Sequence, residues 1–243
     1  MTDTIAVIRA EATRLAQVAR SEPHAPIPRY AGWSMTDLIG HTGSVHQRTI
    51  HIATTLPTEN PGREPAPPLD PPELIDWFEA GANEMADLLA DGDPSQAVWG
   101  FGPDPTIGFW TTRMALETAV HRIDAEEAVG MDDDLDQHLS ALGIDEFGIM
   151  WLAGLPVPEN ASGGYVALEP TDLDVRWVIS AGESFSISRD SDTPAQASFS
   201  DIASDLYLFL LGRITHHRLT ATGDPGAVQA FVGALDAQNE ATL

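Results

Sequence analysis

The chain contains no cysteine and no long apolar run. Without cysteine it can form neither a disulfide framework nor a thiolate metal site, so any thiol in its chemistry must come from outside. No apolar run approaches the roughly 20 residues that cross a bilayer. The first ten residues also lack a basic segment followed by an apolar stretch, so no secretory signal is expected. We therefore expect a cytoplasmic protein.

Positive charge is also scarce, because 37 acidic residues face 12 basic ones and the formal net charge is -25. All twelve basic residues are arginines, with no lysine in the chain. Such a charge argues against nucleic acid or an anionic membrane as a partner. The length of 243 residues is enough for one large or two modest domains.

The hydrophobic pattern changes once along the chain, from helical periodicity to alternating strands. Helices are expected at residues 4–21, 34–54, 71–90, 107–129 and 133–152. After a Pro- and Gly-rich stretch, strands are expected at 165–169, 175–180, 184–188, 195–200 and 218–222, with helices at 201–212 and 225–237. This order predicts a helical domain at 1–155, a linker at 156–162 and a small α+β domain at 163–243.

The helix expected from residue 34 carries the first candidate metal ligand. Ser34 and Asp37 have the spacing of a capping box, which fixes the helix start. Counting on from there, His41 lies on an apolar face with three further residues, Met35, Leu38 and Val45.

Glu117 and His121 form the second part of this candidate site. They lie one turn apart on one helix face, together with Trp110, Met114 and Asp124. A carboxylate and an imidazole on an inward face need a partner, because burying a charge is costly. With His41 they would make a ligand set suited to Zn²⁺, with a fourth position open for water or substrate.

Each of these patterns has a simpler interpretation. A Glu and a His four residues apart are often an ordinary surface pair, and a single His on an apolar face is often a hydrogen-bonded core residue. No regular spacing links His41 to Glu117. Other chemistries have weaker support: the chain has no Gly-rich phosphate loop, nucleophile elbow or H-E-x-x-H pair, and Ser44 lies one residue off the His41 face.

Several motifs together resemble the mycothiol-dependent maleylpyruvate isomerase family, and the resemblance spans nearly the whole chain. The matching residues are Gly32, Trp33, Ser34, Asp37, Leu38 and His41, then Glu117 and residues 121–126, then residues 205–213 and 222–224. The resemblance implies a DinB-like metal-binding four-helix bundle followed by a small α+β, SCP2-like domain. One departure is Ile123, where the family pattern has an aromatic residue, and this would alter the pocket wall.

The resemblance also implies residue roles. It places Zn²⁺, or another divalent metal, on His41, Glu117 and His121, and mycothiol as the thiol cosubstrate. It points to the Gly212-Arg213 pair, so we assign Arg213 as a candidate catalytic and substrate- or thiol-binding residue. Arg213 could instead cap its helix or bridge the two domains through an acidic partner.

Four further histidines leave alternatives open. His46 is a candidate substrate- or thiol-binding residue, and with His51 it could line the cavity or serve as an ordinary surface or supporting residue. The pair at residues 216–217 is expected on the turn after Arg213, where solvation is favoured over metal binding.

The expected chemistry is addition of an external thiolate, stabilised by the metal, to an electrophilic small molecule. Reversible addition to a maleylpyruvate-like cis double bond would permit isomerisation to the trans form, whereas addition to other electrophiles would give a stable conjugate. Two alternatives remain at this point. The protein could be a non-catalytic metal- or ligand-binding regulator, or a zinc hydrolase with Asp124 or Glu126 as general base.

Overall fold

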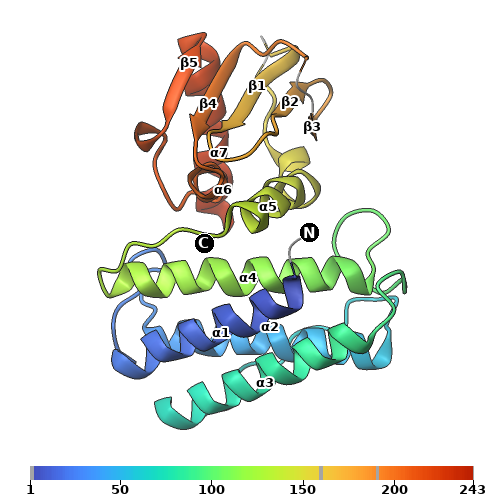
Figure 1. Ribbon diagram of the computed structural model, residues 1–243, viewed down its shortest axis with the longest axis vertical. Coiled ribbons are helices and arrows are strands. Elements are labelled where there is room, and N and C mark those ends of the chain that lie inside the picture. Colours follow the sequence, from blue (N-terminus) through green and yellow to red (C-terminus); the bar gives the residue numbers. More distant parts are fainter. Residues whose placement is uncertain (1–2, 159–160, 190–191, 243) are drawn as a thin grey trace. The chain divides into compact units, whose positions relative to one another are not determined.

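The computed structural model describes residues 3–158, 161–189 and 192–242. The chain divides into two compact units, Met1–Leu135 and Asp136–Leu243 (Figure 1). Within the described residues, no helix combines the length and the apolar character needed to cross a membrane.

The first unit is a bundle of four long helices, as the sequence predicted. They are α1 (Thr4–Ser21), α2 (Met35–Thr55), α3 (Pro71–Asp91) and α4 (Ile107–Ala128). Helix α1 packs against α3 and α4, and α2 packs against the same two helices. The expected long connection between α2 and α3 is present as residues 56–70, which contain no regular secondary structure.

Local capping explains where the helices begin. Ser34 and Asp37 form the predicted capping box, with both reciprocal hydrogen bonds present. Thr106 caps α4 by accepting a hydrogen bond from the Phe109 amide. The core of the bundle includes Leu15, Phe78 and other fully buried apolar side chains. Burying each of these stabilises the fold by about 1.5–3 kcal/mol, which holds the helices that carry the site.

The second unit is a five-stranded sheet with helices, which confirms the predicted α+β class. Its elements are α5 (Gln137–Met150), β1 (Gly163–Pro170), β2 (Trp177–Ala181), β3 (Phe185–Arg189), β4 (Ala197–Asp201), α6 (Ala203–Leu210), β5 (Thr220–Gly223) and α7 (Pro225–Thr242), with short 3-10 turns at Leu152–Gly154 and His216–Arg218. The strand order is β3-β2-β1-β4-β5. Only the β1–β4 pair is parallel among the pairings described. Helices α6 and α7 pack against β1 and β4.

Helix α5 belongs to the second unit, whereas we placed it with the helical domain that ends at residue 155. Its contacts explain the difference. A Cβ atom on Gly143 would lie 2.4 Å from the Tyr207 ring, so this glycine permits α5 to pack closely on α6. The Trp177 indole also donates a 2.7 Å hydrogen bond to Asp145 of α5. The expected linker at 156–162 includes residues 159 and 160, which lie outside the described residues.

Candidate metal centre

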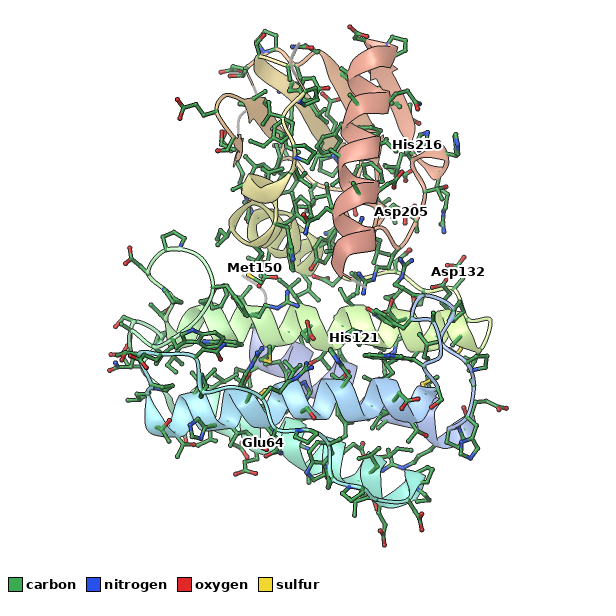
Figure 2. The ribbon with its side chains drawn as sticks, turned by 180° about the vertical axis from the view of Figure 1, so that it is seen from behind. Glu64, His121, Asp132, Met150, Asp205 and His216 are labelled. Atoms are coloured by element: carbon green, nitrogen blue, oxygen red, sulfur yellow. The ribbon has the colours of Figure 1, made fainter. Side chains whose placement is uncertain are left out.

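The bundle brings together the three residues assigned as metal ligands. His41 comes from α2, and Glu117 and His121 come from α4. One ligand atom from each lies within 4.8 Å of the other two. The His41 and His121 ring centroids are 5.2 Å apart, and His121 projects from α4 toward α2 (Figure 2). The folded bundle therefore joins positions that no sequence spacing connects.

The distances fit a divalent cation with tetrahedral ligands. Ligand atoms bound to Zn²⁺ at about 2.0–2.2 Å lie roughly 3.4 Å from one another. In the structure, Glu117 Oε1 lies 3.3 Å from His121 Nε2 and 3.7 Å from His41 Nε2. The Nε2 atoms of the two histidines thus face one oxygen of Glu117, at distances that a small metal ion could bridge.

Asp124 fixes the orientation of His121. Its Oδ2 atom lies 2.9 Å from His121 Nδ1, and the carboxylate is fully buried. This contact leaves Nε2 of His121 for the metal, which is the usual arrangement of a carboxylate behind a metal-binding histidine. Tyr30 OH donates to the same Asp124 oxygen at 3.3 Å, and Arg29 Nε lies 3.7 Å from the other oxygen.

Charged neighbours keep Glu117 ionised despite its burial. Burial alone would raise the pKa of its carboxyl group, but the Arg113 guanidinium and His121 together lower that pKa well below its usual value. Arg113 lies one turn before Glu117 on α4 and forms an ion pair with its second oxygen. Glu117 is therefore ionised at neutral pH.

His121 holds a proton tightly in the metal-free site. Burial would lower its pKa, but Glu117 and Asp124 raise the pKa to about 9. A metal ion at Nε2 must therefore displace a proton at neutral pH.

The site opens to the surface on the His41 side. A pocket of about 470 Å³ is lined by His41, Ser44, Arg63 and neighbouring residues. Trp33 lies against His41 with ring centroids 5.1 Å apart and forms part of the pocket wall. A small molecule in this pocket would contact the ligand set through His41.

The structure places His46 in the core of the bundle. Its side chain is fully buried, stacks on Phe78 and has Nε2 2.9 Å from Thr118 Oγ1. Desolvation lowers its pKa to about 4, so His46 is neutral at physiological pH. His51 is exposed and lines a second pocket of the bundle.

Arg213 lies in the second unit, directly after α6. Gly212 adopts a left-handed conformation with φ of 68°, and the Arg213 amide donates to the Leu208 carbonyl at 2.7 Å, which ends the helix as expected for a glycine stop. The Arg213 side chain is half-buried and donates to the Leu211 carbonyl at 3.1 Å. Its assignment to the site stays a prediction.

Neither proposed general base is available for a hydrolase. Asp124 is engaged with His121, and Glu126 is buried in ion pairs with Arg14 and Arg122. The sequence analysis missed Arg113, whose signal was its i,i+4 spacing from Glu117. It also missed Arg29 and Tyr30, which lie in the turn before α2 and have no local pattern linking them to residue 124.

The class that the fold and the site define is thus a helical bundle whose two histidines and one glutamate could hold a metal ion, and comparisons identify the family of this unit. Residues 6–126 match the family model described as the mycothiol maleylpyruvate isomerase N-terminal domain. The N-terminal unit therefore belongs to that domain family. No curated protein sequence matches the chain.

Solved structures support the same fold over both units. The crystal structure of a mycothiol-dependent maleylpyruvate isomerase is similar, with a TM-score of 0.60, 15% sequence identity, and coverage of 90% of this chain and 92% of that chain. A histidine-to-alanine mutant of a mycothiol-dependent maleylpyruvate isomerase gives a TM-score of 0.62 at 14% identity, with the same coverage. At this identity the likeness establishes the fold alone.

Proposed function

We propose that the protein is a metal-dependent enzyme that uses mycothiol as its thiol cosubstrate. It adds the thiolate to an electrophilic small molecule, either as a maleylpyruvate-type cis–trans isomerase or as a mycothiol S-transferase. The observation that carries the proposal is the His41, Glu117 and His121 cluster, which borders a surface pocket in a chain without cysteine. The family of the N-terminal domain supports mycothiol as the thiol.

The roles of the chain's own residues follow from their contacts. His41 and His121 each offer one imidazole nitrogen, and Glu117 offers one carboxylate oxygen. Asp124 holds the His121 ring, and Arg113 holds the second Glu117 oxygen. A bound divalent cation would supply a Lewis-acidic position that stabilises a thiolate at neutral pH.

Metal and thiol binding test the proposal directly. The purified protein should hold close to one divalent metal ion per chain, and His121→Ala should lose it while retaining helical content. Mycothiol should raise the melting temperature of the metal-loaded protein only. At about 100 times its dissociation constant, the thiol would add roughly 2.7 kcal/mol of stability. An equal shift with and without metal would refute coordination of the thiol.

Product analysis separates the two reactions. With a maleylpyruvate-type substrate and catalytic mycothiol, an isomerase yields the trans isomer and leaves the thiol unconsumed. A transferase consumes one thiol for each product molecule. If metal and mycothiol bind but no electrophile turns over, the protein is a binding module and the enzymatic proposal fails.

Arg213 is proposed as a carboxylate-binding residue of the same enzyme. A guanidinium fork binds a carboxylate at two points, which lysine cannot reproduce. Arg213→Lys should therefore keep the fold and the metal but lose at least about tenfold in turnover of a diacid, equivalent to roughly 1.4 kcal/mol. Unchanged kinetics would leave Arg213 with a structural role.

A further inference from the structure

Arg48 on α2 is partly desolvated and forms no ion pair among the described residues, although the negative charge of Glu117 raises its pKa. Its guanidinium carbon lies 5.5 Å from the ring centroids of both Trp99 and Trp110, and 5.9 Å from that of Phe101. Its Nε atom is buried and has no hydrogen-bond partner. An aromatic cage of this kind favours a cation but does not neutralise its charge.

A second arginine of the same bundle shows the contrast. Arg122 is more deeply buried than Arg48, and it forms ion pairs with Glu11 at 2.6 Å and with Glu126 at 2.7 Å. Such compensation is what a buried charge ordinarily requires. Arg48 lacks it, although the chain carries a large excess of carboxylates.

The position of Arg48 relates it to the metal centre. It lies seven residues after His41, which places it on nearly the same face of α2, about 10 Å further along the helix axis. Its cage residue Trp110 lies seven residues before Glu117 on α4. Arg48 and the ligand cluster therefore occupy successive levels along the α2 and α4 helices.

Arg48 also faces space that a ligand could fill. It lines a pocket of about 710 Å³ whose wall includes His51, Thr54 and the loop at residues 61–67. The loop that carries Glu64 runs beside α2 and α3 there (Figure 2). Pro65 and Pro67 line both this pocket and the one that contains His41.

Charges of both signs surround Arg48. Burial and the positive charges of Arg63 and Arg113 lower the pKa of Arg48, and the negative charge of Glu117 raises it, with a net lowering from the usual value. Burial disfavours the isolated cation, and a bound anion would compensate its charge. Glu64 and Glu84 also line the pocket, and the part of the chain that the structure describes shows no ion pair between either of them and Arg48.

We propose that Arg48, held in its aromatic cage, binds a carboxylate of the electrophilic substrate at a subsite beside the metal centre. The ligand class is a small carboxylic acid, and a diacid could place its second carboxylate nearer the metal ligands. This assignment rests on the proposed function, because it names a recognition element of the same site. The planar guanidinium fork suits a carboxylate.

The test uses maleate as the probe and the metal-loaded protein. Maleate affinity is measured by calorimetry and by quenching of tryptophan fluorescence, since two tryptophans form the cage. Arg48→Met should keep the fold, because the unbranched apolar side chain fills the same cage. It should weaken maleate binding at least about tenfold, or roughly 1.4 kcal/mol. Arg48→Lys keeps the positive charge but lacks the planar fork, so it should also weaken maleate binding. This variant keeps the test available if Arg48→Met does not fold.

A matched control removes one positive charge elsewhere in the bundle. Arg9 forms its ion pair with Asp87 at the surface, so Arg9→Met should bind maleate as the unmodified protein does. Dimethyl maleate, which lacks the charges, should not bind, and inorganic phosphate should bind more weakly than maleate. The mycothiol-induced thermal shift should persist in Arg48→Met.

Three results would overturn the assignment. They are equal maleate affinity in the Arg48 variants, phosphate binding as tight as maleate, and loss of the mycothiol shift in Arg48→Met. Failure of the proposed mycothiol-dependent function can be distinguished from failure of the Arg48 subsite. If mycothiol does not bind the metal-loaded protein but Arg48-dependent maleate binding is found, the thiol chemistry fails and the carboxylate subsite stands.

Discussion

Replacing Asp124 by asparagine should weaken metal binding although Asp124 is not a ligand. The carboxylate lies 2.9 Å from His121 Nδ1 and is fully buried. As the charged form it accepts the Nδ1 proton and leaves Nε2 free. An asparagine can instead donate to Nδ1, which places the imidazole proton on Nε2, where it competes with the metal.

Loss of such an outer carboxylate costs about 10- to 100-fold in metal affinity, or roughly 1.4–2.7 kcal/mol. Competition with a chromogenic chelator at constant pH measures the change, and circular dichroism checks the helical content. Glu127→Gln is the matched control, because Glu127 is an exposed carboxylate of the same helix, three residues further on. Equal affinities for Asp124→Asn and Glu127→Gln would show that Asp124 does not support the ligand set.

Two further predictions concern pH. Because the pKa of His121 is about 9 without metal, a proton must leave as metal binds. Affinity should therefore rise about tenfold per pH unit from neutral pH up to about pH 9 and then level off, and a flat profile would exclude His121 as a ligand. The pKa of His46 is about 4 in the folded protein and about 6.5 in an unfolded chain, so unfolding takes up a proton as the pH falls between these values. Metal-free protein should lose about 3 kcal/mol of stability across this window, and denaturant titrations should show a smaller loss for His46→Gln.

Local features of the sequence predicted the helices well because their determinants are close together in the chain. The Ser34–Asp37 capping box and the proline at the start of α3 lie within one turn of the elements they define. Helix α1 begins and ends at the expected residues, 4 and 21. Patterns that span only a few residues can be recognised without knowledge of the tertiary structure.

The candidate site could be predicted only in part, because its partners are distant in sequence. The Glu117–His121 pair has helical spacing, but His41 joins it only when α2 packs beside α4. The same holds for Tyr30, which reaches Asp124 across 94 positions of the chain. The apolar pattern of helix α5 is compatible with packing on a helical bundle or on a sheet. Its contacts with Tyr207 and Trp177 place it in the second unit.

The charges around the ligand set give a reason for an anionic fourth ligand. Glu117 and Asp124 contribute two negative charges, which the guanidinium groups of Arg113 and Arg29 balance. A divalent cation that displaces the His121 proton therefore adds positive charge with no further carboxylate in the ligand set. An uncompensated charge is costly where burial limits its hydration, so an anion would be favoured over a neutral molecule beside a bound metal ion. The chain has no thiol of its own, so a thiolate that meets this electrostatic need has to come from a separate molecule.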